Sequence, residues 1–210
     1  MRFLMRKVAL ILFAAVAMAM AESYPYTHDG FFLNFSLGFG GQGMDVTGEG
    51  QKDGYKMTVE GEGTGEAFEI DYKVGGRILP FTILHATVLS VRGGLEVHSE
   101  YRSSEKTFDY IEAMYLYGVG ATYYIYPYNF FVSGSLGPVK FVLTGDEEEL
   151  DAATEFGFGF QLAFGKEWWV SENWGLGATL AINYGSVDED SEDFEWSTFA
   201  ITLMFSATFN

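Results

Sequence analysis

The segment Glu155–Gly165, EFGFGFQLAFG, alternates strictly between two kinds of residue. One set is large and apolar: Phe156, Phe158, Phe160, Leu162 and Phe164. The residues between them are small or polar: Gly157, Gly159, Gln161, Ala163 and Gly165. Because successive side chains of a strand point to opposite faces, the segment predicts a strand with one bulky apolar face and one small face.

The same alternation recurs along nearly the whole chain after Glu22, where no window sustains the 3.6-residue period of an amphipathic helix. It is clear at 30–41, 174–186 and 195–209. The strands expected from it lie near 30–41, 66–78, 83–97, 111–126, 129–143, 154–167, 174–186 and 195–209. In the segment 83–97 the polar residues fall on both parities, and one β-bulge would reconcile them.

The connections between these segments alternate in length. Short turns are expected at 79–81, 127–128 and 170–173, and longer polar loops at 42–65, 98–110, 144–153 and 187–194. Short and long loops alternating around an even number of strands are typical of outer-membrane barrels. The sequence therefore predicts an all-β fold, an eight-stranded antiparallel up-and-down transmembrane β-barrel.

The polar face of the strands carries glycines and ionisable groups, and we expect it to line the barrel. A narrow interior suits small residues, whereas a Lys or Arg facing lipid at the bilayer midplane costs roughly 2–4 kcal/mol. The expected lumen ionic network comprises Glu69, Asp71, Lys73, Arg77, Arg92, Glu112, Lys140 and Glu155. It would form a paired plug; the alternative is a narrow, gated ion path.

The first 21 residues have the pattern of a secretory signal peptide. Arg2, Arg6 and Lys7 precede an apolar run, and Ala19-Met20-Ala21 forms a cleavage site. The predicted domains are thus a cleaved signal at 1–21 and a barrel at 22–210. Cleavage removes three of the 12 basic residues and none of the 29 acidic ones, which changes the net charge from −17 to −20.

Composition excludes several classes of protein. A hydrophobic content of 48% is too high for a disordered acidic chain. The absence of cysteine excludes disulfide scaffolds, thiol nucleophiles and Cys-ligated metals. The strong acidity makes nucleic acid an unsuitable partner, because phosphate binding needs Lys and Arg.

Several stretches resemble the outer-membrane β-barrel domain family, the small barrels of the OmpX, OmpW and OmpA transmembrane types. The resemblance is carried by the signal peptide and by the stretches 30–38, 118–124 and 165–177. The closing strand is similar to the family's assembly signal, through Leu203, Phe205, Ala207 and Phe209, although Asn210 follows where the family usually stops. The resemblance implies this fold, an outer-membrane location and assembly by the barrel insertion machinery.

Few motifs suggest chemistry. Residues 38–43 spell G-x-G-x-x-G, but no helix follows to receive a dinucleotide. The three histidines, His28, His85 and His98, form no convincing triad, although His98, Ser99 and Ser103 could reach a rim site. The acid runs 146–151 and 188–193 are expected to be solvated loops or, through divalent cations, contacts to lipopolysaccharide.

We therefore expect no catalytic, cofactor or metal residues and a non-enzymatic protein. Its expected role is structural or surface-interacting, through acidic external loops, as a monomer in the outer membrane. A narrow channel or transporter for small molecules is the alternative, and a lipid-modifying enzyme ranks third.

Overall fold

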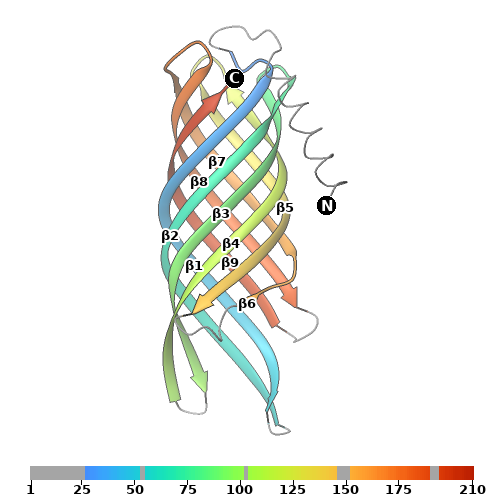
Figure 1. Cartoon of the computed structure of the whole chain (residues 1–210), viewed down its shortest axis with the longest axis vertical. Helices are drawn as coiled ribbons and strands as arrows, with labels where there is room; N and C mark the ends of the chain where they lie inside the picture. Colours follow the sequence, from blue (N-terminus) through green and yellow to red (C-terminus); the bar gives the residue numbers. More distant parts are fainter. Residues whose placement is uncertain (1–26, 53–54, 102–103, 146–151, 190–193) are drawn as a thin grey trace, which may run out of the picture.

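The computed structural model describes residues 27–52, 55–101, 104–145, 152–189 and 194–210. These residues form one closed antiparallel sheet, a barrel with strongly tilted strands (Figure 1). The strands are β1 (Phe31–Lys52), β2 (Tyr55–Leu79), β3 (Thr82–Tyr101), β4 (Ser104–Ile125), β5 (Phe130–Gly145), β6 (Ala152–Ala153), β7 (Gly157–Trp169), β8 (Trp174–Glu189) and β9 (Phe194–Phe209). None of the described residues belongs to a helix that has the length and hydropathy to cross a membrane.

Eight of these strands make the barrel wall, as the sequence predicted. Each pairs with its neighbour in sequence, and β1 closes the barrel by pairing with β9, from Leu33 opposite Phe209 to Gly48 opposite Phe194. The two-residue β6 only adds a short pairing to β5. The predicted antiparallel up-and-down fold is confirmed.

Two of the expected polar loops are instead strand. The β1–β2 ladder continues through the segment 42–65 as far as Lys52 opposite Tyr55, and β3 pairs with β4 as far as Tyr101 opposite Ser104. Both hairpins project beyond the rest of the barrel, at the lower end in Figure 1. Inside β1 the alternation persists, with Met44 and Val46 buried, but the residues around them, such as Gly43, Asp45 and Gly48, have the composition of a loop.

The structure has no bulge within 83–97, so that expectation is wrong. The pairing of β3 with β4 is continuous from Thr82 to Tyr101, and β3 pairs with β2 in one register from Ile83 to Ser99. The register shift lies between Arg77 and Leu79, near the turn. His85 and Thr87 therefore face inward, and Arg92 faces outward.

The barrel has two different ends. The short-turn end carries the connections β2–β3, β4–β5 and β7–β8, and the hairpin end carries the projecting hairpins. Exposed aromatic side chains lie around the short-turn end: Tyr123, Tyr126, Tyr128, Trp168 and Trp174. They form the kind of girdle that marks a membrane interface.

The outer wall between the ends is apolar. Its exposed side chains include Leu37, Phe39, Leu84, Val88, Val119, Val132, Leu136, Phe158, Leu162, Phe164, Leu180, Ile201, Leu203 and Phe205. A continuous belt of this kind is far larger than the apolar patches of soluble proteins and matches a lipid-facing surface. The predicted outward direction of the bulky apolar face is confirmed for this belt.

Candidate functional site: the barrel interior

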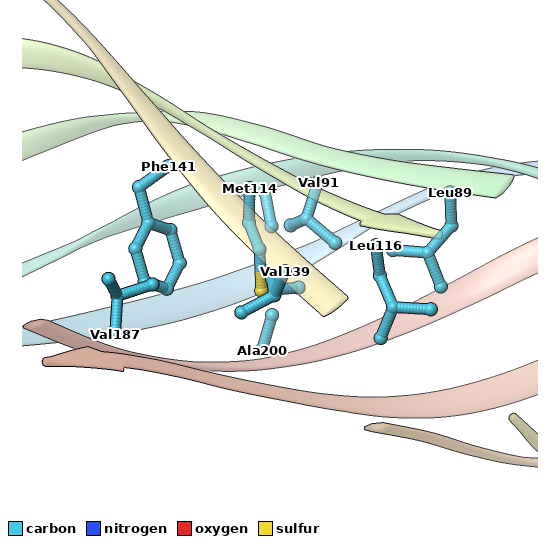
Figure 2. Packing of buried hydrophobic residues seen from close by; sticks show 9 residues of the cluster. Leu89, Val91, Met114, Leu116, Val139, Phe141, Val187 and Ala200 are labelled. Carbon is cyan, nitrogen blue, oxygen red and sulfur yellow. The ribbon is translucent and has the colours of Figure 1, made fainter. Parts of the chain in front are cut away.

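The hairpin-side half of the interior is filled by an apolar layer. Its members are Ala67, Leu89, Val91, Met114, Leu116, Val139, Phe141, Val187 and Ala200, none of them more than 2% exposed. Figure 2 shows these side chains converging from strands on different sides of the barrel. Trp196 packs against the layer, and Met44, Val46 and Leu143 continue the apolar filling. Sequence reasoning assigned no apolar plug to the lumen.

Glu69 lies at the centre of a polar cluster on the short-turn side of this layer. Its carboxylate is fully buried and accepts hydrogen bonds from Gln161 at 2.8 Å, from Asn183 at 2.8 Å and from Thr202. The donors come from β7, β8 and β9, so the bonds cross the barrel from β2. This geometry ties opposite walls together.

An ion pair adjoins that carboxylate. Lys73 donates to Asp71, both side chains being nearly or fully buried, and Gln161 Nε2 lies 3.1 Å from Asp71 Oδ2. Two carboxylates and one ammonium therefore share a region closed to bulk water. We call Glu69, Asp71, Lys73 and their hydrogen-bonding partners the Glu69 cluster.

A second polar group surrounds His85. Its Nδ1 lies 3.0 Å from the Thr87 hydroxyl and its Nε2 lies 3.0 Å from the Thr122 hydroxyl. Ser133 and Ser135 extend this hydroxyl network, at 2.8 Å from Thr122 and Thr87. The histidine and the serines are all buried.

The short-turn mouth of the barrel is covered by His28. The imidazole stacks on Tyr124, with ring centroids 3.4 Å apart, and its two nitrogens lie 3.0 Å from Asn210 Oδ1 and 2.9 Å from Asn129 Oδ1. Below it, Glu167 accepts a hydrogen bond from Thr208 at 2.6 Å. We call His28 and its contacts the mouth plug.

A small cavity lies between these groups. One interior cavity among the described residues has a volume of about 10 Å³ and is lined by Phe32, Asn34, Ser36, Lys73, Thr122, Tyr124, Phe131, Ser133, Glu167 and Thr179. A cavity of that size holds about one water molecule. The described residues around this cavity are therefore closely packed.

The structure brings four of the eight predicted lumen residues inside: Glu69, Asp71, Lys73 and Glu112. Glu112 is separate from the Glu69 cluster and accepts a hydrogen bond from Thr198 at 2.5 Å. The neutral partners Gln161, Asn183 and Thr202 were missed as site residues. Each of them occupies one of the alternate positions that form the small, polar, inward face of its strand, and this position could have identified them.

The other four predicted lumen residues lie elsewhere, which corrects the prediction. Arg77 is exposed at the short-turn end and pairs with Asp29. Arg92 and Lys140 have the outward parity of their strands, because their neighbours Val91 and Val139 are the buried ones. Glu155 is exposed between β6 and β7. The prediction assumed that a membrane barrel turns every strand charge inward, which holds only near the bilayer midplane.

The predicted assembly residues lie on the outer wall. Leu203 and Phe205 face outward, and the Phe209 ring contacts Trp174 with centroids 5.4 Å apart. Their recognition by the insertion machinery stays a prediction.

Some predicted features lie outside the described part of the chain. The signal peptide, the acid run 146–151 and most of the run 188–193 are among them, as are the side chains of His98, Ser99 and Ser103. Among the described residues, no three His, Asp or Glu side chains group as a metal site. Cation bridging to lipopolysaccharide stays a prediction.

The motif at 38–43 lies within β1 and has a backbone role. A Cβ atom on Gly40 would lie 1.8 Å from the carbonyl oxygen of Ile201, across the ladder that closes the barrel. Glycine is therefore required there by the close approach of two strands and not by a dinucleotide.

The mouth plug is expected to loosen in acid. Burial lowers the pKa of His28 below its ordinary value of 6.5, although the hydrogen bonds to Asn129 and Asn210 and the charge of Asp29 act in the opposite direction. The folded state thus favours neutral His28, so its contribution is complete above pH 6.5 and is lost as the pH falls towards the lower folded pKa. We expect hydrogen-exchange protection of residues 28–30 to decrease between about pH 7 and pH 5.

The control for this prediction is His28→Gln, which keeps a hydrogen-bonding group but cannot titrate in this range. Protection in that variant should be independent of pH once intrinsic exchange rates are subtracted. An equal loss of protection in both proteins would contradict a role for His28.

The comparisons with known proteins agree with this fold. No protein-family model matches the chain, and no curated protein matches its sequence. The outer membrane protease OmpT from Escherichia coli aligns with a TM-score of 0.50 and 10% identity, over 90% of this chain and 99% of that chain. Neisserial surface protein A aligns with a TM-score of 0.47 and 10% identity, over 85% and 96%. OprG from Pseudomonas aeruginosa aligns with a TM-score of 0.47 and 14% identity, over 84% and 96%. The chain therefore has the fold of an outer-membrane β-barrel, and its apolar belt agrees with the location that the sequence predicted.

Proposed function

We propose that this outer-membrane barrel is a sealed, non-enzymatic structural or surface-interaction protein, which works through the two hairpins at its hairpin end. The observation that carries this proposal is the apolar layer across the lumen. Ions cross a membrane only where water or polar ligands replace their hydration shell, and a packed apolar constriction offers neither. Several of the polar residues inside, Glu69, Asp71 and Lys73 among them, are hydrogen-bonded to one another or to Gln161, Asn183 and Thr202.

The projecting hairpins are the part of the molecule best placed to meet a partner. They extend past the lipid-facing wall, and their sequence is rich in acids, with Asp45, Glu49, Glu60, Glu62 and Glu66 in the first hairpin. An acidic, projecting surface favours cationic partners or cation-bridged lipopolysaccharide. Interaction with the insertion machinery and a monomeric state belong to the same proposal.

A non-enzymatic role is supported by the burial of the interior chemistry. His85 and Ser133 are the kind of pair in which a histidine activates a serine as a nucleophile, because His85 Nε2 lies 3.4 Å from Ser133 Oγ. Both lie in the packed core, out of reach of lipid or peptide substrates. OmpT is described as a protease, but a likeness at 10% identity concerns the fold alone.

Planar-bilayer recording tests the sealed lumen. We expect the purified, refolded protein to produce no stepwise currents, because its interior lacks a hydrated path. The matched control is Glu69→Gln, which removes a charge from the core while keeping a group that accepts hydrogen bonds. Stepwise currents in the original protein whose ion selectivity changes in Glu69→Gln would contradict the proposal and favour the channel alternative.

A further inference from the structure

Two cations and a tyrosine form a row across the outer wall on the hairpin side. Arg92 on β3, Tyr115 on β4 and Lys140 on β5 all face outward. Tyr115 pairs directly with Lys140 in the β4–β5 register, and Arg92 donates a hydrogen bond to the Tyr115 hydroxyl. The Arg92 guanidinium also lies 5.6 Å from the centroid of that ring. The three side chains therefore belong to one local surface.

The two cations of this row have no carboxylate partner within the described residues. Lys140 Nζ lies 5.5 Å from the ring centroid of Phe156, and neither Lys140 nor Arg92 forms an ion pair there. By contrast, Arg77 at the other end of the barrel pairs with Asp29. Glu66 faces outward on β2 but makes no ion pair with Arg92. Within the described residues, the row thus carries positive charge that no carboxylate neutralises.

The position of the row along the barrel matches the outer boundary of the membrane. Arg92 lies ten residues from Thr82, Tyr115 ten residues from Ile125 and Lys140 ten residues from Phe130, each counted from the short-turn end of its strand. A strand rises about 3.3 Å per residue and tilts by about 45° in such barrels, so ten residues span roughly 23 Å of membrane. The apolar band is about 25 Å tall, which places the row at headgroup level.

An apolar groove begins at this row and runs towards the short-turn end. Its volume is about 480 Å³, and it is lined by Phe68, Ile70, Tyr72, Val88, Leu89, Ser90, Arg92, Tyr115 and Tyr117. Ser90 stands between Ile70 and Tyr115 in the strand registers, so a small residue separates two large ones. Beyond it, Tyr72, Val88 and Tyr117 are neighbours deeper in the membrane. The groove therefore runs from the membrane boundary into the apolar band, as the acyl chain of a lipid does.

We propose that this surface binds one phosphorylated glycolipid of the outer leaflet, the lipid A part of lipopolysaccharide. Its phosphate contacts Arg92 and Lys140, and one acyl chain lies in the groove over Ser90. Arginine suits phosphate because its planar guanidinium presents several donors. The row lies towards the hairpin end of the barrel, which places it in the outer leaflet. The outer leaflet of an outer membrane is built of phosphorylated glycolipid. This site is separate from the acid runs and independent of the sealed lumen.

Native mass spectrometry of the refolded barrel tests the proposal. The protein is mixed in detergent with equal amounts of bis-phosphorylated lipid A and phosphatidylglycerol, and in a second sample with chemically dephosphorylated lipid A. We expect one bound lipid A per barrel, with retention at least about tenfold above that of either other lipid. The Arg92→Gln/Lys140→Gln variant should lose this preference, and Ser90→Phe should lose it while keeping both charges.

The matched control is Lys166→Gln, because Lys166 also faces outward against aromatic rings but at the short-turn end. It should bind lipid A as the original protein does. Heat-modifiable gel migration shows that each variant is folded. Equal retention of phosphatidylglycerol and lipid A, undiminished retention in Arg92→Gln/Lys140→Gln, or equal loss in Lys166→Gln would each overturn the proposal.

Discussion

Replacing Lys73 with methionine is expected to lower the free energy of unfolding of the barrel by about 3–5 kcal/mol. The methionine fills a similar volume, but Glu69 and Asp71 then remain in the core without a counter-charge. Lys73 is the hydrogen-bond donor to Asp71 and is almost fully buried, so solvent cannot take its place. A urea titration of the refolded protein in lipid or detergent measures the loss.

Two further variants make this prediction specific. Lys166→Met removes a partly exposed cation at the short-turn end and should change the unfolding free energy by less than about 1 kcal/mol. Lys73→Met/Asp71→Asn should recover part of the loss, because asparagine removes the unpaired charge and can still contact Gln161. A Lys73→Met protein as stable as the original would show that the ion pair is not needed to hold the Glu69 cluster.

Replacing Gly40 with alanine is expected to have the second large effect. The added Cβ would lie 1.8 Å from the carbonyl oxygen of Ile201, so β1 and β9 would have to separate at the ladder that closes the barrel. Forced backbone shifts of this kind cost about 3 kcal/mol. We expect a lower unfolding temperature on heat-modifiability gels and a smaller folded fraction after refolding.

The neighbouring Gly41 supplies the control. A Cβ on Gly41 would meet its nearest atom, the carbonyl oxygen of Gly65, at 3.8 Å, which is an ordinary contact. Gly41→Ala should therefore fold as well as the original protein. If the two alanine variants behave alike, the effect of Gly40→Ala belongs to strand propensity and not to the closing ladder.

The period-2 pattern was sufficient to predict the barrel, its strand number and the direction of its faces. That success has a simple cause: lipid outside and a crowded interior impose opposite demands on alternate residues, as Phe158 and Gly159 show. The ends of the strands could not be predicted in the same way. Beyond the membrane neither face needs to be apolar, so residues such as Asp45 and Thr47 have a loop-like composition although their backbone continues the ladder.

The contents of the lumen were predictable only in part. Glu69, Asp71 and Lys73 share a parity within one strand, which placed them together. The apolar layer could not be predicted from the sequence, because its members come from several strands. Which of them meet depends on the registers between those strands, and a single sequence does not give these registers. Arg92 was assigned inward because it shares a parity with the polar residues Ser90 and Glu96, with a bulge separating them from His85 and Thr87. The register of β3 overrules that assignment and leaves the cation at the membrane boundary.

The mouth plug sets an order of events during folding. His28 precedes every strand, yet it binds Asn129 in the β4–β5 turn and Asn210 after β9, a contact that spans 182 positions. Contacts of such long range form slowly, because the intervening chain must be organised first. Asn210, the residue that departs from the family pattern, therefore helps to complete a structure that can form only after β1 and β9 have met. A docked His28 thus reports that the barrel has closed.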